Sequence, residues 1–169
     1  MSENTRCSNV QVEGEVDLGT SNIFQPHVRI IQEQNAGPIV IGTNNIFEEC
    51  VTIINKSPGL MKIGNNNLFN TGCCVYAGLI GDYCTISPRA IVGQGSCIED
   101  NCIIGSKCEI PPNQHISKGT LIYGRNNSFR KIASTVGFVA PLHSKHIDYL
   151  VQVLPNSCEQ KYNATIGRF

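Results

Sequence analysis

A hydrophobic repeat with a period of six residues is the feature that most constrains how this chain can fold. Counting in sixes from residue 80, eight consecutive positions are all Ile or Val: Ile80, Ile86, Val92, Ile98, Ile104, Ile110, Ile116 and Ile122. Six residues match neither one nor two turns of an α-helix, so the pattern is not helical. They do suffice for one short strand and a tight turn. The repeat therefore predicts an all-β solenoid of stacked coils.

The same repeat extends toward the N-terminus in shorter blocks. Its anchors there are Val12, Leu18, Phe24 and Ile30, then Ile41, Phe47 and Ile53, then Ile63, Phe69 and Val75. About five residues are added after Ile30 and about four after Ile53, and one residue is missing before Ile80. We therefore predict one parallel β-helix over residues 10–127, preceded by an N-terminal tail over residues 1–9.

The position four residues after each anchor is mostly small. It is occupied by Val16, Asn22, Val28, Asn45, Val51, Asn67, Cys73, Cys84, Ala90, Ser96, Cys102, Cys108, Gln114, Thr120 and Asn126. Alternating large and small positions predict a narrow interior with restricted corners. Free cysteine packs like a small hydrophobe, so we expect the cysteines in this column to be packing residues, with Cys74 and Cys97 facing outward. The asparagines suit left-handed turn conformations.

Composition excludes some classes of function. The chain has 13 basic and 13 acidic residues and no basic block, which argues against nucleic-acid binding. Only 15% of residues are charged, which suggests that partner chains cover part of the surface. The sequence contains no run of 18 apolar residues, so we do not expect direct insertion into a membrane. Without a signal-peptide pattern we expect a cytoplasmic protein whose nine cysteines are thiols.

The period changes near the C-terminus. Ile147, Leu150, Val151 and Leu154 have helical spacing, which predicts an amphipathic helix over residues 141–155, ended by Pro155. We expect this helix to cover one flat face of the solenoid. Residues 128–140 are predicted to be a linker and residues 156–169 an irregular tail.

Segments such as Ile80-Gly-Asp-Tyr-Cys-Thr resemble the hexapeptide-repeat proteins, which are left-handed β-helices. The resemblance implies a triangular prism with three six-residue sides per coil. That superfamily includes acyltransferases and gamma-class carbonic anhydrases, and "GCCVYAGLIGDYCTI" looks like the second group. At the positions that match its zinc-binding histidines this chain has Thr71, Ala77 and the pair Ile54-Asn55. We therefore predict no zinc site, no catalytic residue and no cofactor.

The four histidines are His27, His115, His143 and His146. His115 could act as the general base of an acyltransferase or be a solvated loop residue, and we expect the second. His143 and His146 have a spacing that can chelate a metal, but we expect exposed polar residues at the start of the helix.

Three stretches, "HVRIIQEQNAGPIVIGTNNIFEE", "MKIGNNNLFNTGC" and "HIDYLVQVLPN", are similar to the dynactin subunit 6 family. This resemblance implies a non-catalytic subunit of the dynactin pointed-end subcomplex, which serves dynein-driven transport on microtubules in the cytoplasm. The implied partners are a second left-handed β-helix subunit, forming a heterodimer, an actin-related protein and a larger pointed-end subunit, with cargo adaptors contacted indirectly. We expect a solenoid end to meet the partner, with the insertion at residues 55–62 as a further contact through Lys56, Leu60 and Met61.

Two alternatives stay open at this point. The chain could be a trimeric enzyme related to gamma-class carbonic anhydrases or acyltransferases. It could also be another non-catalytic β-helix assembly protein, such as those attached to respiratory complexes.

Overall fold

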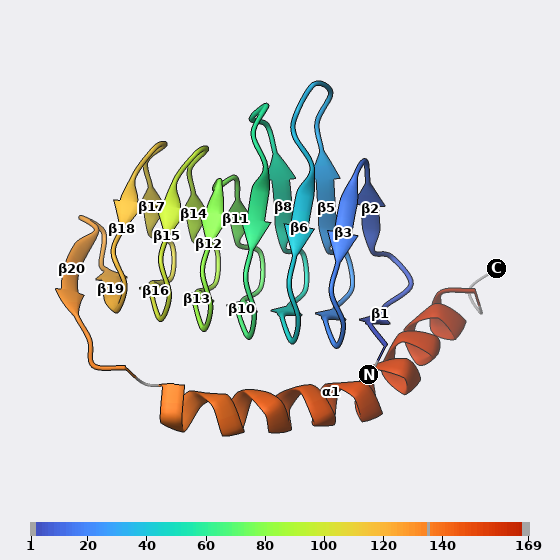
Figure 1. Cartoon of the computed structure of the whole chain (residues 1–169). Coiled ribbons are helices and arrows are strands. Elements are labelled where there is room, and N and C mark those ends of the chain that lie inside the picture. The colour runs from blue at the N-terminus through green and yellow to red at the C-terminus, as the bar shows by residue number, and fades with distance from the viewer. Residues whose placement is uncertain (1–2, 135, 167–169) are drawn as a thin grey trace.

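Three parallel sheets, wound around one interior, form the body of the molecule (Figure 1). The computed structural model describes the backbone of residues 3–134 and 136–166, and the side chains of these residues except 138 and 156–166. The chain passes through the three sheets in turn, so that each coil adds one strand to each sheet.

We call the three sheets A, B and C. The strands are short, and successive strands along the chain belong to successive sheets. Sheet A contains β1 (Thr5–Arg6), β4 (Ile23–Phe24), β7 (Ile46–Phe47), β10 (Leu68–Phe69), β13 (Thr85–Ile86), β16 (Ile103–Ile104), β19 (Thr120–Tyr123) and β20 (Ser128–Lys131). Sheet B contains β2 (Gln11–Glu13), β5 (Arg29–Gln32), β8 (Thr52–Asn55), β11 (Cys74–Val75), β14 (Ile91–Val92) and β17 (Glu109–Ile110). Sheet C contains β3 (Val16–Leu18), β6 (Ile39–Ile41), β9 (Met61–Ile63), β12 (Leu79–Ile80), β15 (Cys97–Ile98) and β18 (His115–Ile116).

The six-residue repeat is the cause of this register. In sheet A, Ile86 pairs with Ile104 and Ile104 with Ile122, each one full coil further along the chain. The anchors of all three sheets point into the prism, and those of the regular coils are buried except Ile116, which is half-buried in the last coil. Each buried Ile or Val contributes roughly 1.5–3 kcal/mol. The predicted β-solenoid is confirmed.

Aromatic rings replace the aliphatic anchors in the early coils of sheet A. Phe24, Phe47 and Phe69 are fully buried and stack, with ring centroids 5.0 and 4.7 Å apart and planes within 6° of parallel. Parallel, in-register strands place equivalent residues about 4.8 Å apart, which is a stacking distance for rings. The stack therefore follows directly from the coil register.

Asparagines form a second column at the corner before sheet A. The Asn45 N–H donates to Asn22 Oδ1 at 2.9 Å, and the Asn67 N–H donates to Asn45 Oδ1 at 3.0 Å. Each amide nitrogen also donates to the glycine carbonyl of the following coil, as from Asn45 Nδ2 to Gly64 O at 2.9 Å. The column continues with cysteine in the regular coils, where the Cys84 N–H donates to Asn67 Oδ1. The predicted structural use of these asparagines is confirmed.

The two insertions lie at the same corner, between sheets B and C, on neighbouring coils. They project as the tallest loops of the molecule (Figure 1). The Gly37 N–H donates to Ser57 O at 2.8 Å, and Asn55 Nδ2 donates to Gly37 O at 2.8 Å and to Gly59 O at 2.9 Å. Asn55 thus holds the two loops together.

A single helix, α1 (Val136–Ile166), returns along the outside of sheet A (Figure 1). Ile147 and Leu150 pack on Ile23 and Ile46, which point outward from β4 and β7. The predicted helix on one face of the prism is confirmed.

The segment boundaries differ from those predicted. In the predicted N-terminal tail, β1 pairs with β4, and in the predicted linker β20 turns back antiparallel on β19. The helix begins inside that linker and continues through Pro155 and into the predicted tail, so the prediction that Pro155 ends it is wrong. A proline removes one N–H donor, and here the helix continues with that bond missing. The hairpin formed by β19 and β20 was not predicted, because β20 does not continue the six-residue repeat.

Candidate assembly surface at the open end of the solenoid

The column of cysteines is a packing feature. As predicted, Cys73, Cys84, Cys102 and Cys108 are buried free thiols. Cys74 and Cys97, which we expected to face outward, are half-buried. Burial raises the pKa of Cys73 far above its ordinary value, so this thiol stays protonated. Cys7 is disulfide-bonded, and the expectation that every cysteine is a thiol is wrong for this residue.

The positions that matched zinc ligands serve other purposes. Thr71 is an exposed turn residue whose N–H and Oγ1 donate to Glu48 Oε2 at 2.9 and 3.1 Å. Ala77 is buried in the core, and Asn55 holds the stacked loops. Within residues 3–134 and 136–155, where side chains other than that of residue 138 are described, no three His, Cys, Asp or Glu side chains form a group that could hold a metal.

His27 and His115 lie apart from each other on the solenoid, whereas His143 and His146 lie three residues apart on α1. His27 occupies an exposed turn with a φ of 63°. His115 lies in β18, largely exposed, with Nε2 2.8 Å from Glu99 Oε1. His143 lies in α1 and is buried against the solenoid, with Nε2 2.6 Å from the carbonyl oxygen of Asn44, so the expectation of an exposed residue is wrong for it. The side of the helix that faces the solenoid begins at His143, one turn before Ile147, where the sequence pattern placed its start. His146 is half-buried.

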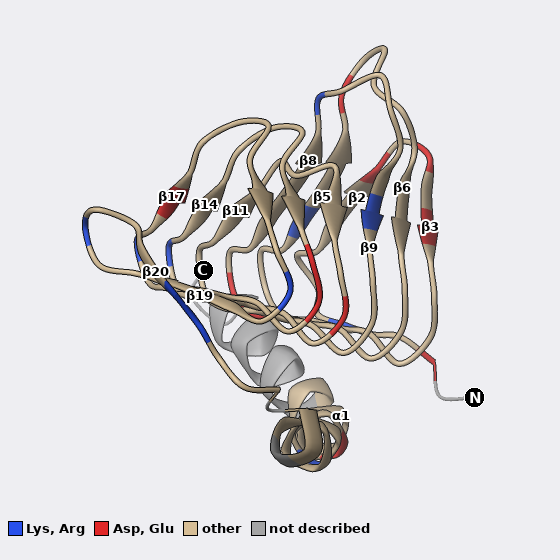
Figure 2. Cartoon of the chain, turned by 60° about the vertical axis from the view of Figure 1, so that its left-hand side comes forward, with Lys and Arg blue, Asp and Glu red and all other residues tan. Residues whose placement is uncertain are grey.

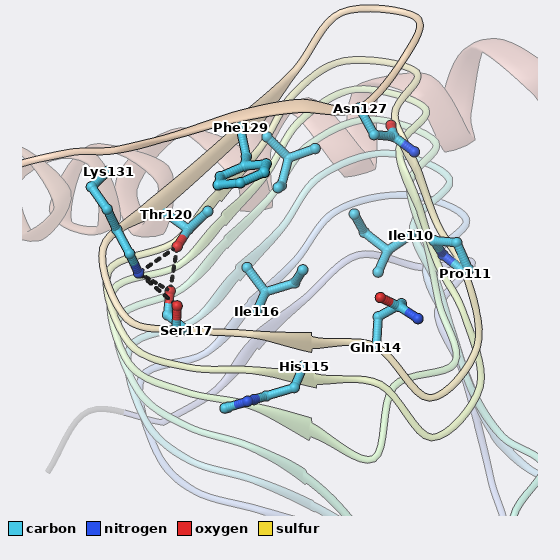
Figure 3. A pocket seen from close by; sticks show the side chains of 11 residues that line it. Ile110, Pro111, Gln114, His115, Ile116, Ser117, Thr120, Asn127, Phe129 and Lys131 are labelled. Carbon is cyan, nitrogen blue, oxygen red and sulfur yellow. Dashed lines mark hydrogen bonds between the residues drawn. The ribbon is translucent and has the colours of Figure 1, made fainter.

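The last coil leaves the interior of the prism open. A hollow of about 310 Å³ has an apolar floor made by Ile110, Ile116 and Ile122, with Phe129 of β20 beside them. Figure 3 looks into this hollow, with side chains from all three sides pointing toward its centre. Phe129 is 73% exposed, an unusual state for a phenylalanine. Exposed apolar surface of this kind makes the hollow a candidate binding surface.

The strand edges around the hollow are also unpaired. β17 and β18 are the terminal strands of sheets B and C, and no further described strand pairs with either. Backbone groups on such edges can pair with another strand. On β17 one of them is already used, because Asn127 Nδ2 donates to the Glu109 carbonyl oxygen at 2.7 Å. The end of the solenoid therefore offers both apolar surface and backbone hydrogen-bonding groups.

A lysine fixes the hairpin that borders the hollow. Lys131 Nζ lies 2.6–3.2 Å from four oxygen atoms, which belong to Ser117, Lys118 and Thr120. Figure 3 shows the contacts with Ser117 and Thr120. A compact ammonium can donate three hydrogen bonds, and these acceptors use them. β20 is therefore held in place on the last coil, and Phe129 with it.

Carboxylates also brace this end. The N–H of Lys118 donates to Glu99 Oε2 at 2.7 Å, and Lys118 Nζ lies 3.3 Å from Asp100 Oδ2. The backbone N–H of Lys118, and then His115, lower the pKa of Glu99 below its ordinary value. The hydrogen bond from the Asp82 N–H, with Lys118 adding to it, lowers the pKa of Asp100. Both side chains therefore stay ionised on the coil below the open end.

Curated proteins similar to this chain share one name. Dynactin subunit 6 of Nematostella vectensis is 36% identical over 162 residues, which span 89% of this chain and 84% of that protein. Dynactin subunit 6 of Danio rerio is 35% identical, spanning 89% of this chain and 80% of that protein. The chain belongs to the dynactin subunit 6 family. No family model matches the sequence.

Solved structures similar to this member of the dynactin subunit 6 family share its fold. A hexapeptide transferase family protein from Anaplasma phagocytophilum superposes with a TM-score of 0.71 at 14% identity, covering 89% of this chain and 92% of that one. A putative acetyltransferase from Bacillus cereus gives a TM-score of 0.59 at 13% identity, covering 88% and 90%. Identities this low establish the fold alone. The left-handed hexapeptide-repeat β-helix implied by the resemblance is confirmed.

The predicted contact loop of this dynactin subunit 6 relative is only partly accessible. Lys56 is exposed, 3.5 Å from Glu33 and stacked over the Tyr76 ring at 4.9 Å, and Leu60 is 52% exposed. Met61 is 1% exposed in β9 and does not offer a contact surface, because the alternation along the strand turns it into the core. No helix among the described residues is long and apolar enough to cross a membrane.

Proposed function

We propose that the chain is a non-catalytic structural subunit of the dynactin pointed-end subcomplex, supporting dynein-driven microtubule transport and cargo-adaptor binding. Membership of the dynactin subunit 6 family over 89% of the chain is the observation that carries this proposal. The location that follows from it is cytoplasmic and associated with the cytoskeleton.

The partners in this proposal are other pointed-end subunits. A second left-handed β-helix subunit forms a heterodimer with the chain, and an actin-related protein and a larger subunit complete the subcomplex. Cargo adaptors are then contacted through the assembled complex. The open solenoid end, with its free strand edges and apolar hollow, supports an assembly role because it provides a docking surface for another β-helix.

The absence of catalysis is part of the proposal. Thr71, Ala77 and Asn55 replace the zinc ligands of the enzyme relatives, and each has a structural environment of its own. His115 is paired with Glu99 on an exposed strand. The transferase neighbours share the fold at 13–14% identity, which carries no information on activity.

Affinity purification of the tagged chain from its own cells tests the function. We expect dynactin subunits, including an actin-related protein and a second hexapeptide-repeat subunit, to be recovered in fixed proportion. A purified chain that remained a monomer and recovered no dynactin subunit would refute the assignment. Hydration of carbon dioxide with stoichiometric zinc would instead support the enzyme alternative.

The loop at residues 55–62 is proposed as a second, weaker contact. Lys56 and Leu60 would carry it, since both are exposed on one of the two loops that project from the prism, the one between β8 and β9. Leu60→Asp should then reduce recovery of one pointed-end subunit, whereas Lys62→Glu on the neighbouring exposed strand position should not. Equal recovery with both variants would remove the loop from the interface.

A further inference from the structure

The corners between sheets B and C form a notch beside the inserted loop at residues 55–62. The next corner, between β11 and β12, is one residue shorter than a regular corner, because Val75 and Ile80 are five residues apart. Figure 1 shows the drop from the tall loop after β8 to the low corner after β11. Gln94 Nε2, from the corner after β14, donates to Ser57 Oγ at 3.1 Å and bridges the short corner. An insertion and a deletion on neighbouring coils therefore leave a hollow at this edge of the prism.

This edge hollow has a volume of about 470 Å³. In the order of the coils, its lining runs from Lys56 and Tyr76 through Ile91 to Glu109 and Pro111. Ile91 is 36% exposed on β14, so apolar surface reaches the solvent in the middle of the hollow. The edge hollow is therefore apolar at its centre and charged at both ends, which is the arrangement of a protein-binding surface.

Three equivalent positions on successive coils set the shape of the edge hollow. β11 pairs with β14 and β14 with β17 in register, so positions 76, 93 and 111 form one column. Tyr76 and Pro111 carry rings, whereas Gly93 between them has no side chain. The close approach of the next coil requires this glycine, because an added Cβ would lie 2.6 Å from both Ile110 O and Pro112 N. The column therefore holds two rings on either side of a position without one.

The spacing of the coils decides what fits between the two rings. Tyr76 and Pro111 lie two coils apart, which is a separation of about 10 Å at about 4.8 Å per coil. A planar ring placed midway would lie about 4.8 Å from each of them, which is a stacking distance. The interior of the prism stacks rings at the same spacing, since Phe24, Phe47 and Phe69 are 5.0 and 4.7 Å apart. The edge hollow therefore has the height of one aromatic ring.

Charges of opposite sign stand at the two ends of the edge hollow. Figure 2 shows a basic residue on the loop after β8 and an acidic residue on β17, with β11 and β14 between them. These residues are Lys56 and Glu109, three coils and about 14 Å apart. Lys56 Nζ lies 3.5 Å from Glu33 and over the Tyr76 ring, but this ion pair is exposed and contributes less than about 1 kcal/mol, so Lys56 can turn to another carboxylate. Among the side chains that the structure describes, none forms an ion pair with Glu109.

We propose that the edge hollow binds one aromatic side chain from an extended segment of another polypeptide, with an acidic residue two positions to one side and a basic residue two positions to the other. Alternate side chains of an extended chain point the same way, and three of them span about 13 Å. That length matches the separation of Lys56 and Glu109, and the two charges of the segment complement theirs. A single aromatic molecule would reach at most one of the two charged ends, which is why we assign a peptide segment.

A fluorescent peptide tests the site on the purified full-length chain. The chain has no tryptophan, so a peptide that carries one gives a signal free of background. The probe is acetyl-Gly-Asp-Ser-Trp-Ser-Lys-Gly-amide, whose emission should move to shorter wavelength as the indole enters the hollow. The same peptide with Phe in place of Trp should displace the probe, and the peptide with Leu should do so about three- to tenfold less well, because it cannot stack.

An exchange of charge tests the ends of the hollow. Glu109→Lys should bind the probe about fivefold more weakly and should recover affinity for a second probe, in which Asp replaces Lys. The variant leaves the fold intact, since the hydrogen bond from Asn127 goes to the backbone carbonyl of Glu109. Glu13→Lys is the matched control, because Glu13 is an exposed glutamate on β2, at the opposite end of sheet B, and it should bind both probes as the native chain does.

The ring contact has its own variant. Tyr76→Ala should weaken the native probe about tenfold and remove the difference between the Phe and Leu peptides. Circular dichroism and the urea midpoint of this variant show whether the chain stays folded. If it does not, Glu109→Lys and the second probe still decide the question, because that exchange touches no packed side chain.

Other results would overturn the site. These are an unchanged emission of the probe, equal displacement by the Phe and Leu peptides, or equal binding of both probes by the native chain and Glu109→Lys. If the pure chain formed dimers that Tyr76→Ala abolished, the occupant would be a second copy, and the assigned peptide would be wrong.

The site rests on the proposed function only in sharing Lys56 with the loop contact, and the two can fail separately. If dynactin subunits were recovered from cells but no probe bound the pure chain, the site would be removed and the proposed function would stand. If the probe bound and no dynactin subunit was recovered, the site would stand and the proposed function would fail.

Discussion

The imidazole of His143 on α1 lies with Nε2 2.6 Å from the backbone carbonyl oxygen of Asn44 in the solenoid, 99 residues away in the sequence. The acceptor is a carbonyl, so Nε2 carries the proton and donates. Asn44 occupies a left-handed turn with a φ of 57°, directly before the buried Asn45 of the asparagine column. This contact joins the helix to the corner of the prism and fixes the position of α1 along sheet A.

Removal of the His143 side chain should loosen the helix. His143→Ala leaves a covered carbonyl without its donor, and we expect a loss of about 1–3 kcal/mol in the free energy of unfolding. Urea denaturation measures the loss, and hydrogen exchange in α1 should accelerate. Ser144→Ala, at an exposed neighbouring position, should change neither. Unaltered exchange in the His143 variant would show that Ile147 and Leu150 hold the helix without it.

The same contact predicts a dependence on pH. Burial lowers the pKa of His143 below its ordinary value, a hydrogen bond to Asn44 acts in the opposite direction, and His146 adds to the lowering. The unfolded chain therefore binds a proton more readily, and the free energy of unfolding should fall as the pH drops below about 6.5. His143→Gln, which can still donate to the carbonyl, should lose this part of the dependence. Identical urea midpoints against pH for both proteins would contradict the assignment.

Replacing a buried asparagine of the column should lower the free energy of unfolding strongly. Asn45 is fully buried, and Asn45→Ala would strand the Asn67 N–H and the Gly64 carbonyl. Each buried group left unpaired costs about 1–3 kcal/mol, so we expect a total loss of roughly 2–6 kcal/mol. Asn126→Ala, on an exposed turn, should cost less than about 0.5 kcal/mol. If both variants lost a comparable free energy of unfolding in chemical denaturation, the buried hydrogen bonds of Asn45 would contribute no more than an exposed asparagine does.

The phenylalanine stack should tolerate a change of shape better than a loss of volume. Phe47 lies between Phe24 and Phe69, and Phe47→Ala should cost about 3–5 kcal/mol in thermal or urea unfolding. Phe47→Ile should cost clearly less, because the same column already accepts Ile86 in a later coil. If the two substitutions were equally destabilising, ring stacking rather than filled volume would govern this column.

The thiols should separate by burial when the native chain is alkylated. Cys50 is exposed on a turn, whereas Cys73 is fully buried with a raised pKa. The thiolate is the reactive form, so a maleimide should label Cys50 in the native state and Cys73 only after unfolding. Mass spectrometry of peptides from native and urea-treated protein gives the answer. Rapid native labelling at Cys73 would indicate that the corner of the prism opens.

The hexapeptide register was readable because it is local and repeated. Ile86, Ile104 and Ile122 recur at fixed spacing, and each of them packs in its coil as the equivalent residue does in the neighbouring coil. The replacement of zinc ligands by Thr71 and Ala77 was also visible, since it required only the residue types at known positions. These features belong to single coils, and the sequence alone was sufficient for them.

The remaining features depend on which residues meet across long distances. The contact of His143 with Asn44, the stacking of the two inserted loops and the return of β20 on β19 have no periodic signal, because each arises from a single pairing. The burial of Met61 and the exposure of Phe129 follow from the strand face and from where the solenoid stops. The sequence alone determined the repeating coil. Only the tertiary structure decided what covers its sides and what its open end leaves exposed, because those surfaces form once all coils are stacked.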